Sequence, residues 1–282
     1  MEEALQLTEK ALRTFPTHST LLQNATAFAG TLGDLSRAEN YARKNLSLNT
    51  NKAFAHNNLG LILQKQGNIA GAKQYYETAL KLNPNHEEAL VNLGSIIKNE
   101  KNYTQAIELY QRALRLNQKN SAVINNLGRV CIVQNRFDEA EKYYQEALKL
   151  EPNNPDYHWN MALTCLAKLD FQRAWQHAEY RMDTARYSKR ITPPSVKAPE
   201  WKGEPLQGKT ILLWFEQGVG DEIMFASLLP ELSQITAKIF VACDERLVTL
   251  FNRSFEFIQA IAKDPDNQYK ALDNDLDFHL AM

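Results

Sequence analysis

The chain has 282 residues, a net charge of −1 and only three cysteines. The balanced charge excludes a broad electrostatic attraction to nucleic acid or to an anionic membrane, and no run of about 20 apolar residues could span a bilayer. Because three cysteines make no disulfide framework, we expect a reducing, cytoplasmic setting.

Small residues recur every 34 residues along the first two thirds of the chain. This period is typical of stacked helical pairs, in which no unit can bury its apolar face alone. Small side chains at these positions allow the paired helices to approach closely. The two clearest series are Ala4, Ala38, Ala72, Ala106, Ala140, Ala174 and Gly60, Gly94, Gly128, Ala162.

Residues 53–86 serve as the template repeat. Apolar spacing predicts a first helix over 53–66 and a second helix over 69–82. Gly67 is placed to end the first helix, and Pro84 prevents the second from continuing. We expect five full repeats, preceded by half a repeat at residues 1–15 that has only a second helix.

The repeats resemble the tetratricopeptide repeat family. The resemblance is carried in one unit by Leu127-Gly128, Ala140, Tyr144, Ala147 and Pro152. It implies that residues 1–188 form an α-α superhelix, a solenoid of about five and a half repeats. In this family the first helices line a concave face, so the expected partner is a protein or an extended peptide in that groove.

An asparagine series keeps the same period on the first helices. A carboxamide both donates and accepts hydrogen bonds, so a regular series could pair with a peptide backbone without reading its side chains. The repeats resemble those of protein O-GlcNAc transferases, where such a ladder holds the substrate. The alternative is that Asn-Leu-Gly is simply frequent in these repeats. The series is Asn24, Asn58, Asn92, Asn126 and Asn160.

Further groove-side candidates are mixed in charge and show no evident single-sign patch for an acidic peptide tail. They are Asn57, Asn125, Trp159, Arg129, Lys65 and Lys98. The Tyr75-Tyr76 and Tyr143-Tyr144 pairs fit packing better than a binding stripe. Cys131 and Cys165 are expected to be small apolar packing residues, and no metal site is predicted.

Three prolines within residues 191–200 exclude a regular helix, and we assign 189–207 to a proline-rich linker. Alternating strand and helix patterns in 208–282 then predict a parallel sheet of doubly wound type, a partial α/β Rossmann-like domain. The expected strands are 210–215, 238–242 and 276–280, and the expected helices are 221–232 and 244–252.

Residues Gly203 to Thr210 match the spacing of a phosphate-binding loop. That chemistry requires a strand before the loop and a helix after it, so that helix amides point at phosphate. Here a proline-rich segment precedes and a strand follows. These flanking elements argue against nucleoside triphosphate binding despite the matching spacing. Lys209 is expected to start the strand from solvent.

A second turn follows the first predicted strand, at the edge of the sheet where ligands of open α/β folds bind. Its glycines, Gly218 and Gly220, permit close approach of a ligand to the backbone. Asp221 is expected either to cap the next helix or to act as a general base. The neighbouring candidates are Glu216, Gln217 and Glu222.

The run from Phe171 to the C-terminus resembles a bacterial family that joins tetratricopeptide repeats to a glycosyltransferase-like domain. The glycine-aspartate turn also resembles that of the heptosyltransferases, which implies a catalytic base at Asp221. A complete homologue would use a nucleotide-sugar donor, but no cofactor is expected in this chain. The resemblance is carried by Ala174-Trp175, Tyr180-Arg181, Trp201 to Leu206, Gly208 to Leu213 and Glu216 to Ile223.

The resemblance implies an acceptor-side part of a transferase without its donor lobe, inactive by itself. The alternative is a pure protein-protein interaction scaffold whose α/β part is a dimerising remnant, since an incomplete sheet edge invites pairing with a second copy. A nucleotide-binding switch would require the Gly203 to Thr210 loop and is disfavoured.

Overall fold

The structure is a computed structural model that describes residues 1–184, 194–215, 218–264, 269–272 and 274–282. The chain divides into two compact units, Met1–Arg181 and Met182–Met282. The predicted linker, 189–207, includes residues 189–193, which lie outside the described residues.

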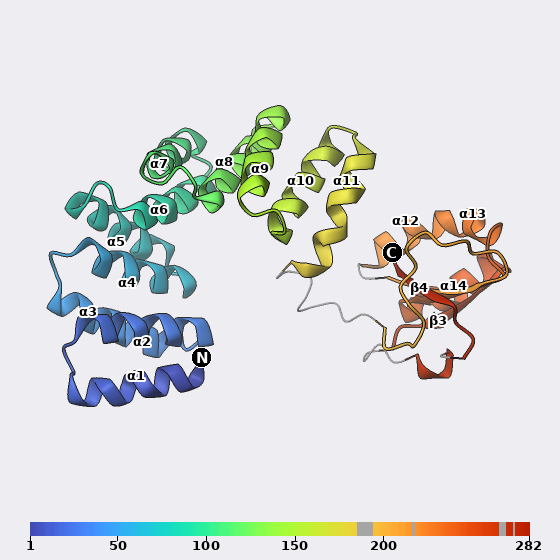
Figure 1. Ribbon diagram of the computed structural model, residues 1–282, viewed down its shortest axis with the longest axis horizontal. Helices are drawn as coiled ribbons and strands as arrows, with labels where there is room; N and C mark the ends of the chain where they lie inside the picture. The colour runs from blue at the N-terminus through green and yellow to red at the C-terminus, as the bar shows by residue number, and fades with distance from the viewer. Residues whose placement is uncertain (185–193, 216–217, 265–268, 273) are drawn as a thin grey trace. The chain divides into compact units, whose positions relative to one another are not determined.

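The first unit consists of antiparallel helices stacked in chain order (Figure 1). A single helix precedes five helical pairs, as the sequence period predicts. The helices are α1 (Glu2–Thr14), α2 (Ser19–Leu32), α3 (Leu35–Leu48), α4 (Ala53–Lys65), α5 (Ile69–Leu82), α6 (Glu87–Asn99), α7 (Tyr103–Leu116), α8 (Ser121–Val133), α9 (Phe137–Leu150), α10 (Pro155–Ala167) and α11 (Phe171–Ala178), with a 3-10 turn, η1 (Glu179–Asp183), at the end.

Each pair has a first helix (α2, α4, α6, α8 and α10) and a second helix (α3, α5, α7, α9 and α11). Each first helix contacts the next first helix, whereas second helices meet one another at most weakly. The stack therefore curves toward the first helices. We call the exposed side of the first helices the concave face.

A glycine on the first helix and a tyrosine on the second set the distance between paired helices. A Cβ atom added to Gly60, Gly94 or Gly128 would lie 2.8, 2.8 or 2.6 Å from the tyrosine ring of the same repeat. The rings belong to Tyr76, Tyr110 and Tyr144, each at most 1% exposed. In the last repeat Ala162 faces the position of Ala178, so a larger residue is tolerated where the ring is missing.

The turn between the two helices of each repeat has the same backbone conformation in all five repeats. The residue before the second helix's N-cap has a positive φ in all five repeats, at Gly33, Gly67, Lys101, Asn135 and Leu169. The following residue caps the second helix in four repeats, as when Asn68 accepts a hydrogen bond from the Gly71 amide (3.0 Å). The cap fails at Arg136, which has no side-chain acceptor.

The second unit contains a four-stranded parallel sheet in the order β3-β2-β1-β4. The sequence predicted β1, β2 and β4 but missed β3. The strands are β1 (Thr210–Trp214), β2 (Lys238–Cys243), β3 (Ile258–Ala262) and β4 (Phe278–Ala281), and the helices are α12 (Val219–Phe225), η2 (Ala226–Leu228), α13 (Leu229–Ser233), α14 (Glu245–Ser254) and η3 (Lys270–Leu272).

Alternate strand residues pack into two separate clusters. Ile211 and Leu213 face a cluster that includes Leu229 and Phe251 from the helices. Leu212 and Trp214 face a second cluster, to which Val196, Tyr269 and Leu272 also belong. Among the described residues, α12–α14 therefore cover one face of the sheet. The helix predicted over 221–232 is divided into α12, η2 and α13.

The outer edge of β4 is partly paired within the chain. The His279 amide donates to the Pro199 carbonyl (3.0 Å), and the Trp201 amide donates to the His279 carbonyl (2.8 Å). Backbone groups that are already paired cannot hydrogen-bond to a second copy. This contact removes part of the edge on which the predicted dimerisation depended, and homodimerisation itself is not shown.

Candidate functional site

The asparagine series lies on the first helices, one residue on each of α2, α4, α6, α8 and α10. Asn24 is exposed and the other four side chains are half-buried, so none of the five belongs to the core. Within the described chain, the carboxamides of Asn24, Asn58 and Asn126 have no hydrogen-bond partner.

The other two members of the series are braced by the preceding repeat. Asn92 Nδ2 donates to Asn57 Oδ1 (3.1 Å), and Asn160 Nδ2 donates to Asn125 Oδ1 (2.8 Å). Asn57 and Asn125 are only 6% and 9% exposed. Their prediction as groove-side binding residues was wrong, because they serve as acceptors between neighbouring first helices. The Asn-Asn dipeptides, two repeats apart, were the available signal.

An open hollow lies between α2 and α4, and Asn58 is part of its wall. Gln23 and Gly30 line the α2 side, whereas Leu61 and Lys65 line the α4 side. Lys65 Nζ donates to the Gly30 carbonyl (3.2 Å) and forms no ion pair with any described carboxylate. The concave face therefore offers a carboxamide and an ammonium group beside apolar surface.

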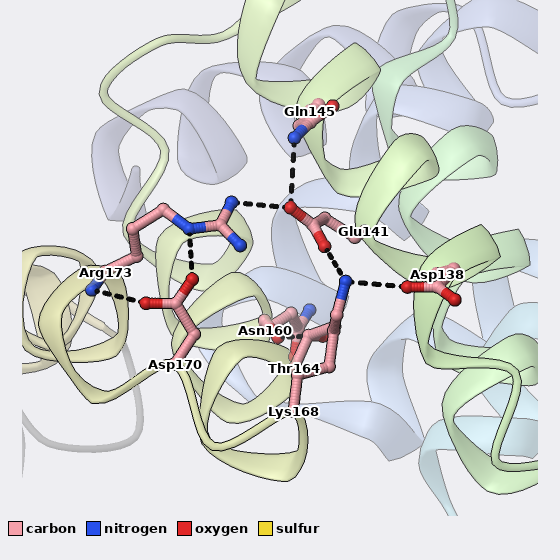
Figure 2. A network of polar contacts seen from close by, with 8 residues as sticks. All are labelled: Asp138, Glu141, Gln145, Asn160, Thr164, Lys168, Asp170 and Arg173. Atoms are coloured by element: carbon pink, nitrogen blue, oxygen red, sulfur yellow. Dashed lines mark hydrogen bonds and ion pairs between the residues drawn. The ribbon is translucent and has the colours of Figure 1, made fainter.

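A charged network that sequence reasoning missed joins the last two repeats (Figure 2). Glu141 is 9% exposed, and its carboxylate accepts hydrogen bonds from Arg173 Nη1 (2.5 Å) and Lys168 Nζ (2.6 Å). These contacts, first Arg173 and then Lys168, hold the pKa of Glu141 below its ordinary value. Asp138 also pairs with Lys168, and Asp170 also pairs with Arg173. The network links the last two repeats, and each of its cations is paired with two carboxylates.

The positions of Glu141 and Lys168 are also in contact in two earlier repeats, where other residues occupy them. Glu39 accepts from Gln66 (2.8 Å), and Lys73 donates to Glu100 (2.7 Å). Each link joins a second helix to the end of the next first helix, 27 residues further along. In the Lys73–Glu100 link the cation lies on the second helix, whereas in the Glu141–Lys168 link the carboxylate does. The positions of the contact are therefore repeated, although the signs of the charges are not.

The turn predicted as a sheet-edge site is only partly described. Glu216 and Gln217 lie outside the described residues. Gly218 and Gly220 are exposed, and Asp221 is half-buried. Asp221 does not cap the helix: Gly218 occupies the N-cap position of α12 and no side chain bonds there. The capping interpretation was wrong, because the helix begins two residues before Asp221.

Glu222, the neighbouring candidate, has a structural position. It is 1% exposed, accepts a hydrogen bond from the Asp244 amide (2.8 Å) and pairs with Lys263 Nζ (2.5 Å). It thereby connects α12 to the ends of β2 and β3. A carboxylate engaged in this way cannot serve as a free general base.

The Gly203 to Thr210 segment has no phosphate-loop geometry. Thr210 begins β1, so no helix follows the loop. Lys209 pairs with Asp277 (2.9 Å), which also accepts from the Thr210 amide (2.8 Å). The lysine therefore fixes the start of the strand, as expected.

The described residues contain neither a membrane-spanning helix nor a cluster of metal ligands. None of the helices there has both the length and the apolar content needed to cross a membrane. No group of three or more histidine, cysteine, aspartate or glutamate side chains in those ranges could hold a metal ion.

Comparison with known proteins places the repeats in a family. Three models described as tetratricopeptide repeat match residues 53–86, 75–108 and 99–169. The helical unit is therefore an array of tetratricopeptide repeats, a class of protein-interaction scaffold. The comparisons give no support to the glycosyltransferase resemblance of the second unit.

Individual relatives match parts of the chain. Protein FlbA of Caulobacter vibrioides is 34% identical over 86 residues, which cover 27% of this chain and only 14% of FlbA. The Pseudomonas aeruginosa pilF structure is 22% identical, covers 62% of this chain and 77% of pilF, and has a TM-score of 0.54. The APC/C hetero-tetramer Cut9-Hcn1 is 22% identical over 67% of this chain and 38% of that chain, with a TM-score of 0.62. At these identities the two structures support the fold alone.

Proposed function

We propose that the helical unit binds an extended segment of a partner protein along its concave face, with the asparagine series pairing with the peptide backbone. The observation that carries this proposal is the state of three carboxamides. Asn24, Asn58 and Asn126 are accessible, and each lacks a hydrogen-bond partner in the described chain. A carboxamide can satisfy both a peptide N–H and a peptide C=O.

The spacing of the series suits an extended chain. Packed helices lie roughly 8–10 Å apart, and an extended peptide advances about 3.3 Å per residue, so one first helix corresponds to about three peptide residues. Asn24 and Asn58 lie on adjacent first helices, and Asn126 lies two further on. These three positions would therefore meet a segment of about nine residues.

Asn92 and Asn160 fit the same scheme, but each offers a peptide one N–H donor fewer than the unpaired asparagines do. Asn92 and Asn160 each commit Nδ2 to the preceding repeat, while Oδ1 has no partner in the described chain. They can accept from a peptide amide but have one donor fewer to offer. Between Asn58 and Asn160 the proposed ladder thus alternates positions with two N–H donors available and positions with one.

The test uses an array of overlapping 12-residue peptides probed with the full chain. The double variant Asn58→Ala/Asn126→Ala should lose about 30-fold in affinity for the peptides that the wild type binds, since two lost hydrogen-bond pairs cost about 2 kcal/mol. Asn40→Ala is the matched control, because Asn40 is exposed on the second helix α3. An unchanged binding pattern for the double variant would refute the ladder.

For the second unit we keep the interaction scaffold as the better supported interpretation. One observation still favours a Rossmann-like acceptor lobe: the exposed glycine turn at Gly218 and Gly220 follows the carboxyl end of a central parallel strand, β1. Assays of sugar-nucleotide hydrolysis and transfer, comparing the wild type with Asp221→Ala, test it. Equal background rates for both would remove the transferase interpretation.

A further inference from the structure

Lys98 and Arg129 on the concave face, like Lys65, have no carboxylate partner in the described chain. Lys98 lies on α6 and is half-buried, and Arg129 lies exposed on the neighbouring helix α8. No ion pair or hydrogen bond involves either charged group there. In contrast, Lys168 and Arg173, the two cations of the charged network in Figure 2, are both paired with carboxylates.

The 34-residue period places these cations around one site between α6 and α8. The hollow between α2 and α4 is lined by Gly30, Asn58 and Leu61. Two repeats later, 68 residues along, the equivalent positions hold Lys98, Asn126 and Arg129. Because α6 and α8 contact each other as α2 and α4 do, the three side chains surround the equivalent place on the concave face.

A tyrosine hydroxyl adds a fourth donor. The Tyr76 hydroxyl donates to Gln64 (2.7 Å), and the Tyr110 hydroxyl bonds to Ser95 (3.1 Å), both on first helices. The Tyr144 ring packs under Gly128 in the same way, but its hydroxyl has no partner in the described chain. Arg129 occupies the position in this repeat that Ser95 occupies in the preceding one, and an arginine side chain can only donate hydrogen bonds.

The two positive charges of the cluster lie close enough to affect each other. Burial, and then the charge of Arg129, lower the pKa of Lys98. Burial raises the pKa of Tyr144, and the positive charge of Arg129 opposes that rise. Positive charge and hydrogen-bond donors thus lie close together with no described carboxylate paired to them, and pairing the half-buried Lys98 ammonium with an anion would lower the free energy of the site.

We propose that Lys98, Asn126, Arg129 and the Tyr144 hydroxyl bind the carboxylate of an aspartate or glutamate side chain in the docked peptide. This inference rests on the proposed function and deepens it: the asparagines hold the backbone, and this cluster selects an acidic residue at one position. A carboxylate can accept from several donors at once, and its hydrogen bonds to charged donors are stronger than neutral ones. The site lies between the third and fourth full repeats counted from α2.

The test compares immobilised full-length chain binding three pools of biotin-labelled nonapeptides. The pools share mixed neutral flanks and differ only at the centre, which is glutamate, glutamine or phosphoserine. We expect the glutamate pool to bind about tenfold more tightly than the glutamine pool, with the difference shrinking as salt is raised.

The variants use residues that the chain itself has at equivalent positions. Arg129→Leu introduces the residue found at Leu61, and Lys98→Gln introduces the residue found at Gln64. Each should reduce the preference for glutamate about fivefold or more and change binding of the glutamine pool by less than about twofold. Arg115→Leu, on the second helix α7, is the matched control and should change neither.

The outcomes separate this inference from the proposed function. Binding of the glutamate and glutamine pools with equal affinity, or an acidic preference that survives both substitutions, overturns the carboxylate site and leaves the backbone ladder standing. A phosphoserine preference more than about tenfold above glutamate overturns the assignment to a carboxylate. Failure of every pool to bind the wild type overturns the proposed function and the inference together.

Discussion

Gly128 offers the sharpest test of how the repeats pack. Gly128→Ala would place a Cβ atom 2.6 Å from Cε1 of Tyr144, a ring that is 1% exposed and has little room to move. Overpacking a core costs about 1–3 kcal/mol, whereas replacing a mid-helix glycine with alanine gains about 1 kcal/mol. The expected net effect is a loss of about 1 kcal/mol in the free energy of unfolding, the middle of a range of about 0–2 kcal/mol.

The partner substitution reverses the sign. In a Tyr144→Ala background the ring is absent, so Gly128→Ala should stabilise by about 1 kcal/mol through helix propensity alone. The double variant recreates the pairing of Ala162 with Ala178 that the last repeat already uses. The expected coupling energy between the two sites is about 2–3 kcal/mol.

Urea unfolding followed by circular dichroism at the helix band measures these differences. Gly30→Ala is the control, because its new Cβ would meet the flexible end of Ile62 at 3.2 Å, and it should be neutral or mildly stabilising. Stabilisation by Gly128→Ala in the otherwise wild-type chain, or a coupling energy near zero, would refute the packing argument.

Three further predictions concern other parts of the chain. Glu222→Gln should destabilise the second unit by about 1–3 kcal/mol in chemical unfolding, because the Lys263 ammonium, 30% exposed, loses its charged partner; no measurable effect would contradict a structural role. The pKa of Glu141 is lowered by Arg173 and Lys168, so its stabilisation is present above the unfolded carboxyl pKa of about 4.3 and is lost as pH falls below that value. Thermal unfolding of Glu141→Gln should accordingly depend less on pH between about 5 and 3 than that of the wild type, and equal slopes would argue against it. Leu169→Gly should raise the thermal midpoint, since Leu169 has a φ of 60° and is 73% exposed, and left-handed backbone costs a non-glycine residue about 1 kcal/mol; a lower midpoint would show that its side chain contributes packing.

The helical unit could be predicted closely from its period. The helices expected over 53–66 and 69–82 are α4 (Ala53–Lys65) and α5 (Ile69–Leu82). Prediction worked here because each repeat depends mainly on its nearest neighbours, so local patterns determine the packing. It was weaker in the second unit, where β3 (Ile258–Ala262) was missed: a short edge strand with mixed burial has no clear alternation.

The candidate sites were less predictable than the fold. The asparagine series was found by register, but nothing in the register showed that Asn92 and Asn160 donate to Asn57 and Asn125. The spacing around Asp221 suggested a cap, yet Gly218 occupies the N-cap position and the helix begins at Val219. Both errors concern side-chain partners, which depend on contacts between helices or on the geometry of one turn.

By itself, the sequence determined the number of repeats, the helix boundaries of the template repeat and the helices on which the asparagines lie, because all three follow from a fixed period and from the helical twist. Only the tertiary structure decided which asparagines are free, that Glu222 is an internal ion-pair partner, and that Lys98, Arg129 and Tyr144 lack acceptors. The physical reason is that hydrogen-bond and ion-pair satisfaction belongs to pairs of groups far apart in the chain. A one-dimensional pattern can place each group on a face, but only packing brings its partner within about 3 Å.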